Sequence, residues 1–161
     1  MTPSTDAAPP DTIAPPGSLF RLVARAEAVT WALLLTGMFL KYVTRTTEVG
    51  VQLGGMLHGV VFVAYVVVSL AVAVDARWSA GRTVVALLSA VPPFATLWFE
   101  RSADRRRDLP AAWRLRGTAP SSTRERVLAG LLRRPLGGAL VGLGVVAALT
   151  GLALLVGPPT G

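Results

Sequence analysis

The sequence predicts an all-α integral membrane protein, a helical bundle with four transmembrane helices. Residues 51–74 form a run of twenty-four almost purely apolar residues, and a helix of that length spans a hydrocarbon core of ~30 Å. Hydrophobic residues make up 52% of the chain and the mean hydropathy is +0.55, values too high for the surface of a soluble domain of this size. The basic residues lie in segments that flank the apolar runs, a topology signal of membrane proteins.

Composition also excludes several kinds of function. The chain has no cysteine, so it has no disulfide, no thiolate metal site and no cysteine nucleophile. A net charge of +7 could indicate nucleic acid, but arginines that flank membrane segments form no single basic face, and we expect no nucleic-acid partner. His58 is the one histidine and no HExxH, GxSxG or paired-carboxylate motif occurs. We therefore expect no metal, no cofactor and no catalytic residue.

Residues 1–17 predict a disordered tail, because they are rich in Pro and Ala, carry two aspartates and no base, and have no apolar period. We expect no secretory signal peptide, since no small-residue cleavage pattern follows the first apolar stretch. A second short tail is expected over residues 157–161.

The first span is predicted from Leu22 to Val43. Between Glu27 and Lys41 there are too few uncharged residues to cross the membrane, so both charges must lie at or inside the edges of the hydrocarbon. Both charges share one face with three apolar residues at 4,3,4,3 spacing, and we expect this face to contact neighbouring helices: Glu27, Trp31, Leu34, Met38, Lys41.

The second span covers residues 51–74 and contains His58. A stripe at helical spacing holds its polar atoms: Gly55, His58, Phe62, Tyr65, Ser69. The pairs Gly50/Gly54 and Gly55/Gly59 have small-xxx-small spacing, which predicts a close helix contact beside the histidine.

The third span is predicted from Thr83 to Phe99, with a kink at Pro92-Pro93. Its polar residues also share one face, which ends at Glu100. Residues 18–100 are thus expected to form a core of three spans with an inward-facing polar seam.

Residues 101–135 predict an arginine-rich cytoplasmic loop. Its last part carries a capping-box pattern, Ser122 to Glu125, before apolar residues at helical spacing, so we expect a short amphipathic helix at the lipid surface. Residues 101–121 fit a solvated basic linker equally well. We expect Arg105, Arg106 and Arg107 to contact anionic lipid headgroups.

The fourth span, residues 136–156, has no charge and carries Gly137, Gly144 and Gly151 at heptad spacing, as a packing helix does. Four spans with the arginine loop in the cytoplasm place both termini outside the cell membrane. Twelve basic residues then lie inside and four outside, which agrees with the positive-inside rule.

This topology predicts where the polar residues meet. Lys41, His58 and Glu100 are expected near the inner leaflet, with a Lys41–Glu100 pair, and Glu27 at the outer level. Together with Tyr65 they form the candidate intramembrane polar cluster. For His58 two interpretations stay open: a structural bond to a neighbouring helix, and a proton-carrying role.

The same residues carry a resemblance. Phe20-Arg21, Leu40-Lys41-Tyr42, His58-Gly59 and Pro93-Phe94, with Trp31, Gly54 and Tyr65 between them, resemble the YdzA-like family of small bacterial integral membrane proteins of unknown function, over about residues 20–100. The resemblance implies a membrane location and a core of three spans. It supplies no activity, cofactor or catalytic residue.

Two functions follow from these features. The first is a non-enzymatic membrane module that associates with itself or with a membrane protein partner through its glycine faces. The alternative is a small transporter or channel subunit with a polar path lined by Glu27, Lys41, His58 and Glu100. An enzyme acting on lipid or quinone ranks third, since only the His/Glu/Lys cluster favours it.

Overall fold

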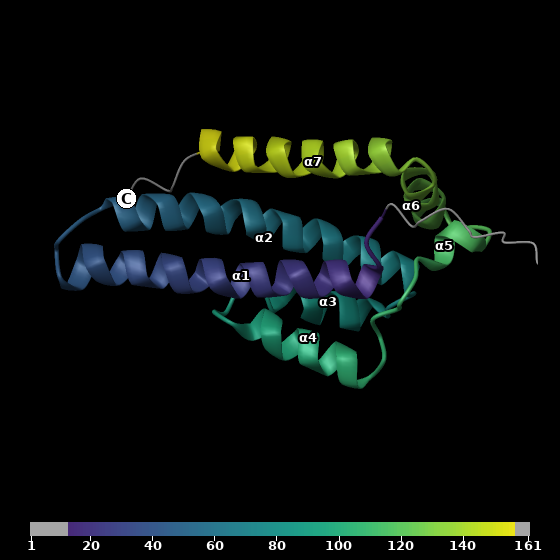
Figure 1. The fold of residues 1–161 in the computed structure, drawn as a ribbon, viewed down its shortest axis with the longest axis horizontal. Coiled ribbons are helices and arrows are strands. Elements are labelled where there is room, and N and C mark those ends of the chain that lie inside the picture. The colour runs from purple at the N-terminus through teal and green to yellow at the C-terminus, as the bar shows by residue number, and fades with distance from the viewer. Residues whose placement is uncertain (1–12, 157–161) are drawn as a thin grey trace, which may run out of the picture.

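The computed structural model describes residues 13–156, and within that range the chain is all-helical with no strand. Two long antiparallel helices, α1 (Pro16–Met38) and α2 (Val49–Asp75), lie side by side along the length of the molecule (Figure 1). A π-helical turn, Phe39–Val43, extends α1. A short turn then leads to α2 and leaves Lys41 and Arg45 at the end of the pair opposite to Pro16.

Sequence explains the length of both helices. Pro16 stands in the first turn of α1, where its fixed φ suits the helix and its missing N–H costs nothing. No further proline interrupts α1, none interrupts α2, and most residues of both helices are apolar. Among residues 13–156, the single helices long and apolar enough to cross a membrane, by length and composition, are those over residues 16–43 and 49–75.

The predicted third span is not a crossing helix. Two short helices replace it, α3 (Ala80–Leu88) and α4 (Ala95–Arg105). Pro92 and Pro93 lie in the turn between them, and Phe94 adopts a left-handed conformation with φ 65°. Two prolines remove two backbone donors, and the chain reverses there instead of kinking.

Contacts at both ends show that α3 and α4 form a hairpin. The start of α3 lies beside the end of α4, because Arg82 Nη2 is 2.8 Å from Asp108 Oδ2. At the turn, Trp31 Nε1 donates to the Ala90 carbonyl over 3.4 Å, and Trp31 is in the middle of α1. The hairpin therefore enters from the end of the bundle where α1 begins and reaches about half-way along it (Figure 1).

The segment after α4 folds against the same end of the bundle. It contains α5 (Arg114–Gly117) and α6 (Thr123–Arg133), and α7 (Pro135–Val156) then runs back beside α2 (Figure 1). The predicted helix after Ser122 is α6, and Ser122 Oγ accepts from the Glu125 N–H at 3.2 Å. A third span is counted only if α6 and α7, which meet at 116°, are taken as one broken span. The prediction of four spans is therefore not confirmed in residues 13–156.

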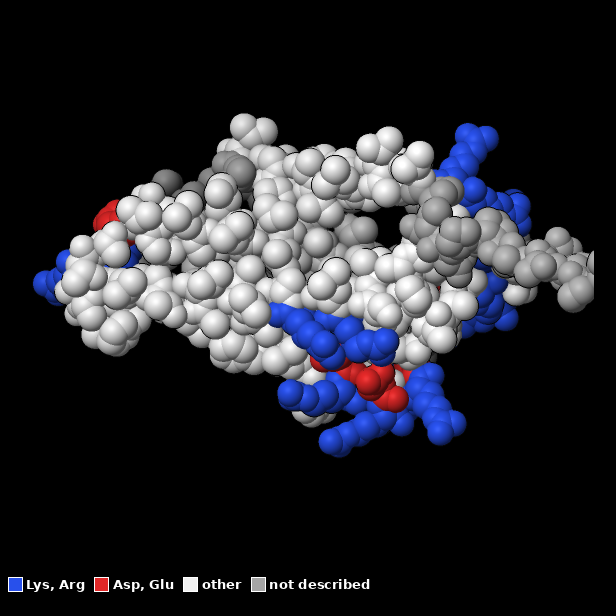
Figure 2. Space-filling view, in the orientation of Figure 1, with Lys and Arg blue, Asp and Glu red and all other residues white. Residues whose placement is uncertain are grey.

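These contacts correct the predicted topology. Arg21 Nη1 lies 2.9 Å from Asp104 Oδ1, and Gly17 N–H donates to the Pro110 carbonyl over 3.1 Å. The beginning of α1 and the arginine-rich segment thus share one end of the bundle, whereas the predicted topology put them on opposite sides. The cause is the hairpin, which returns the chain to the side it came from. Figure 2 shows most of the basic side chains gathered around α4, α5 and α6.

The best-buried part of the core also lies at this end. Four aromatic rings from α1, α2, α4 and the turn after α2 contact one another with centroids 5.6 to 5.9 Å apart: Phe20, Tyr65, Trp78, Phe99. Phe20, Tyr65 and Phe99 have no exposed surface. This aromatic core fixes the position of the hairpin against α1 and α2.

Candidate functional site

Polar residues of α1 and α4 form a ladder that runs into the bundle. The two helices are antiparallel, and Asp104, Glu100 and Thr96 are one helical turn apart on α4, so they share a face. Arg21 pairs with Asp104, Arg25 Nη2 pairs with Glu100 Oε1 at 3.1 Å, and Glu27 Oε2 accepts from the Thr96 hydroxyl at 2.6 Å. The carboxyl side chains become less exposed with depth, from 55% for Asp104 to 7% for Glu100, whereas the arginine side chains stay partly exposed.

Glu27 is the innermost carboxyl group of this ladder and has no exposed surface. Only one of its side-chain oxygens is bonded, because Oε1 has no hydrogen-bond partner in the structure. A buried carboxyl oxygen without a partner costs free energy, so Glu27 is a candidate functional residue of the bundle.

His58 connects to Glu27 through Thr30. The Thr30 hydroxyl donates to the Glu27 carbonyl over 2.9 Å and lies 3.2 Å from His58 Nδ1. A hydroxyl has one hydrogen, so with that hydrogen on the Glu27 carbonyl the Thr30 oxygen can accept from Nδ1 in the tautomer that carries its hydrogen there. The imidazole also packs against the Trp31 ring with centroids 4.4 Å apart. His58 therefore bonds α2 to α1, which is the structural interpretation of this residue.

Tyr65 makes the corresponding bond between α2 and α3. Its buried hydroxyl lies 2.9 Å from the Ala86 carbonyl, to which it donates, and 3.0 Å from Ser89 Oγ. Both partners belong to the hairpin. Tyr65 thus holds the hairpin against α2 next to the aromatic core.

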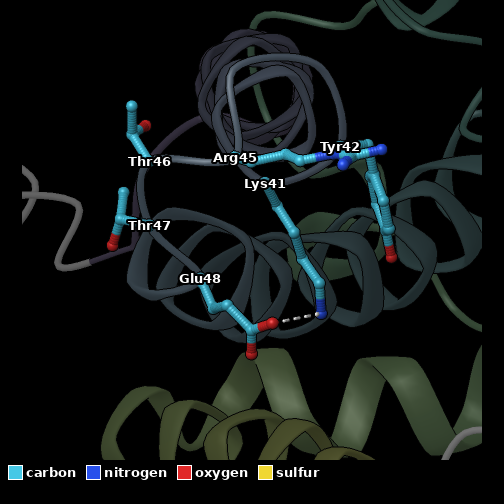
Figure 3. A pocket seen from close by; sticks show the side chains of 6 residues that line it. All are labelled: Lys41, Tyr42, Arg45, Thr46, Thr47 and Glu48. Carbon is cyan, nitrogen blue, oxygen red and sulfur yellow. Dashed lines mark ion pairs between the residues drawn. The ribbon is translucent and has the colours of Figure 1, made fainter.

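Lys41 lies apart from the other four predicted site residues. It is in the π-helical turn at the far end of the bundle, where Nζ lies 3.5 Å from Glu48 Oε1. This pair (Figure 3) lines an open hollow of about 460 Å³, whose other lining residues are Tyr42, Arg45, Thr46 and Thr47. The predicted Lys41–Glu100 pair is wrong, because the hairpin carries Glu100 to Arg25 near the start of α1. Glu27 and Glu100 are instead neighbours on one ladder.

Glycines make the close contact between α1 and α2, and both members of the predicted pair Gly50/Gly54 belong to it. A Cβ on Gly37 would collide with the backbone of Gly50, and one on Gly54 would come within 3.0 Å of Leu34 Cα. Of the predicted packing glycines, Gly55 reaches only the Leu34 side chain, and a Cβ on Gly137 would meet only Arg134 of the same segment. A Cβ on Gly59, Gly144 or Gly151 would meet nothing within 4 Å.

A second polar cluster, outside the spans, was not predicted. Asp75, at the end of α2, is fully buried, and its two carboxylate oxygens accept the backbone N–H groups of Arg114 and Leu115, each at 3.0 Å. Trp113 Nε1 also donates to the Ala14 carbonyl over 2.9 Å. These bonds tie residues 113–115 to the bundle, so this part is not a free linker. The sequence feature that could have predicted this cluster is Asp75 itself, an acidic residue directly after the apolar run 51–74.

Glu125 is the centre of this cluster. Arg77 Nε donates to Oε1 over 3.0 Å, Arg114 Nη2 does so over 2.6 Å, and the Ser121 N–H donates to Oε2 over 2.7 Å. The Arg77 bond, followed by the Ser121 N–H, lowers the pKa of Glu125 from 4.5 to about 2. Glu125 therefore stays ionised and fastens α6 to the end of α2.

Comparisons with known proteins agree with a membrane protein of unknown function. The family model described as "Domain of unknown function (DUF3817)" matches residues 18–105, more than half of the chain. The protein named "Putative membrane protein SCO5905" from Streptomyces coelicolor is 51% identical over 92 residues, which are 56% of this chain. The same match covers 11% of that relative's length, and no solved structure matches. The name YdzA-like is not confirmed by these matches.

Proposed function

Since the chain belongs to the family described as a domain of unknown function (DUF3817), whose matched part covers the α1–α4 unit, we propose that it is a non-enzymatic module of the membrane. Its role is to associate with a second copy of itself or with a larger membrane protein. The apolar surfaces of α1 and α2 set it in the bilayer as a multi-pass protein.

The observation that carries this proposal is a pair of unoccupied glycine positions on α7. Within the chain, Gly37 and Gly50 bring two helix backbones into direct contact. Gly144 and Gly151 are one heptad apart on α7, and neither has a neighbour within 4 Å of a Cβ placed there. A glycine face of this kind on an apolar helix accepts another helix at close range.

The long relative supports the same role. It carries a segment similar to this unit within a chain of which the match is only 11%. A unit that recurs as a small part of a longer membrane protein is expected to act through the parts attached to it or assembled with it.

Crosslinking in native membranes tests this association. We expect the wild-type protein to give a crosslinked dimer or a complex with a partner, and Gly144→Leu with Gly151→Leu to lose it, because leucine blocks close approach. Gly142→Leu is the matched control, since Gly142 lies on the other side of α7 and its position is equally open. Monomers alone in the wild type, or equal loss with the control, would contradict the proposal.

A polar path is the second candidate, and the unpaired Oε1 of Glu27 favours it. The ladder from Asp104 through Glu100 to Glu27, followed by Thr30 and His58, gives a line of polar groups that reaches mid-span. We include Glu27, His58 and Glu100 in this path and leave Lys41 out, because it lies at the other end.

Flux measurements in proteoliposomes test the path. Glu27→Gln and His58→Ala are expected to abolish any proton flux, and Lys41→Gln to leave it unchanged. If the wild type shows no proton flux, or if the flux persists in both Glu27→Gln and His58→Ala, the polar-path function is wrong.

We also propose that the arginine-rich end faces the cytoplasm. Of the sixteen basic residues, only Lys41 and Arg45 belong to the opposite end of the α1–α2 pair. This difference in the number of basic residues between the two ends is larger than the twelve inside and four outside of the predicted topology. By the positive-inside rule it also puts the arginine-rich segment in the cytoplasm. In this orientation the start of α1 is also cytoplasmic, and the exposed Arg105, Arg106 and Arg107 face anionic headgroups.

A further inference from the structure

A groove of about 610 Å³ lies where the end of α2, the start of α3 and the start of α6 meet. The residues that line the groove are apolar in one part and basic in the other. Leu70, Val74 and Val84 supply an apolar part, and Arg77 and Arg124 supply a basic part. Leu70 and Val84 are about half exposed, at 43% and 51%, so nothing in the described chain covers the apolar part.

The position of the groove places its two parts at different depths of the membrane. Asp75 ends the apolar helix α2, and Arg77 follows it two residues later. Leu70 is seven residues before Arg77, about 10 Å deeper at 1.5 Å per residue. Trp78 lines the groove at the level of Arg77, and tryptophan is enriched at the membrane–water interface. The apolar part therefore lies at the level of acyl chains and the basic part at the level of headgroups.

Charge at the upper part of the groove favours an anion. Arg77 is 58% exposed and uses Nε for Glu125 and Nη2 for Ser121. Glu125 is the one carboxylate in the lining, and its bonds to Arg77 and Arg114 neutralise it. Arg124 is exposed in the first turn of α6, where the positive end of the helix dipole adds to its charge. The basic part thus keeps a positive surplus beside the first turn of a helix.

We propose that this groove is a binding site for an anionic phospholipid, with the phosphate at Arg77 and Arg124 and one acyl chain along Leu70, Val74 and Val84. A phospholipid combines a charged phosphate and an apolar chain in the order in which the groove presents its two parts. A transmembrane helix of a partner protein, unlike a phospholipid, does not carry an anionic group at the headgroup level as a general feature, and so does not by itself match Arg77 and Arg124. The bound lipid fills the space between α6 and the corner of α2 and α3.

Native mass spectrometry of the full chain in mild detergent tests the site. Phosphatidylglycerol and phosphatidylcholine are titrated separately, because they share the phosphate and differ in net charge. We expect one phosphatidylglycerol to bind at least tenfold more tightly than phosphatidylcholine. Arg124→Gln should weaken phosphatidylglycerol binding at least tenfold and leave phosphatidylcholine within twofold, since this exposed side chain is not part of the contacts that hold Glu125.

Two further variants separate the groove from general surface charge. Val84→Trp fills the apolar part without a change of charge, and it should weaken binding of both lipids at least tenfold. Arg101→Gln is the matched control, because it removes one exposed arginine outside the groove and should change binding less than twofold. Equal binding of the two lipids, equal loss in Arg101→Gln and Arg124→Gln, or a crosslink from position 84 to another protein would overturn the proposal.

Discussion

At the scale of single residues, the buried carboxyl groups of the described chain divide into a pair between α1 and α4 and a pair at the end of α2. Glu27 and Glu100 lie in a ladder between α1 and α4, where each has one partner. Asp75 and Glu125 lie at the end of α2, where each accepts several hydrogen bonds. The first pair leaves a carboxyl oxygen, Oε1 of Glu27, without a hydrogen bond inside the bundle. The second pair attaches the arginine-rich segment to the end of α2.

Glu125 makes the attachment of α6 sensitive to acid. Its folded-state pKa of about 2 lies below its usual 4.5, so its contribution to stability is complete above pH 4.5 and is lost as the pH falls towards 2. We expect Glu125→Gln to lower the melting temperature in detergent at pH 7, and the difference from wild type to shrink between pH 4.5 and pH 2. Glu48→Gln, at an exposed pair, is the control and should give no such trend. A difference that is constant over this pH range would contradict the assignment.

Arg107 stores backbone strain at the end of α4. It adopts φ 57°, and the Asp108 N–H donates to the Ala103 carbonyl over 2.9 Å, as in a helix end that normally uses glycine. We expect Arg107→Gly to stabilise the protein by about 0.5 to 1 kcal/mol, measured by reversible unfolding in mixed micelles. Arg101→Gly, at an exposed position inside α4, should destabilise it by a similar amount. Destabilisation by both would show that Arg107 contributes more than its conformation.

At the scale of helices, the break at Pro92-Pro93 determines the fold. An apolar segment of this length reads as a span, but two prolines and the left-handed Phe94 turn it into a hairpin that goes back to its own side. The buried bonds from Trp31 and Tyr65 to the hairpin satisfy some of the backbone groups left free in the turn. A hairpin in place of a span changes the side of everything that follows.

The contact of α1 with α2 depends most on glycine at position 37. Gly37→Ala puts a methyl group into the backbone of Gly50, and we expect a loss of about 1 to 3 kcal/mol from overpacking, despite the better helix propensity of alanine. Gly59→Ala, at an open position of α2, should be neutral or slightly stabilising. Unfolding of both variants in mixed micelles measures the difference. Equal stability of the two would mean that the helices can separate without cost.

At the scale of the whole molecule, the arrangement concentrates positive charge at one end (Figure 2). The arginine-rich segment, the start of α1 and the start of the hairpin all share that end, and the turn with Lys41 is at the other. Such a dipolar distribution gives the protein a single favourable orientation in a membrane with an anionic cytoplasmic leaflet.

Cysteine accessibility measures this orientation directly, because the natural chain has no cysteine. We expect Thr46→Cys, in the exposed turn before α2, to react with an impermeant maleimide on intact cells. Ala111→Cys, an exposed position after α4, should react only after lysis. The opposite pattern would reverse the proposed orientation, and labelling of both in intact cells would contradict a two-sided arrangement.

How far the sequence alone reaches can be judged from particular residues. Length and hydropathy identify α1 and α2, because an apolar run that spans a bilayer has few other uses. The capping residue Ser122 locates the start of α6, because that signal is local. Helical spacing also puts Glu27, His58 and Tyr65 on faces directed at neighbouring helices, but it does not name their partners Thr96, Thr30 and Ser89.

The sequence by itself therefore determined that this is a helical membrane protein and that the segments of α1 and α2 are apolar enough to span. Only the tertiary structure decided that the third apolar segment turns back, that the start of α1 shares its end with the arginine-rich segment, that Glu100 joins Arg25 and not Lys41, and that Gly37 is the partner of Gly50. The physical reason is that hydropathy and capping act over a few residues. The direction of a chain after a double proline depends instead on packing against helices distant in sequence, here through Phe20, Tyr65 and Phe99.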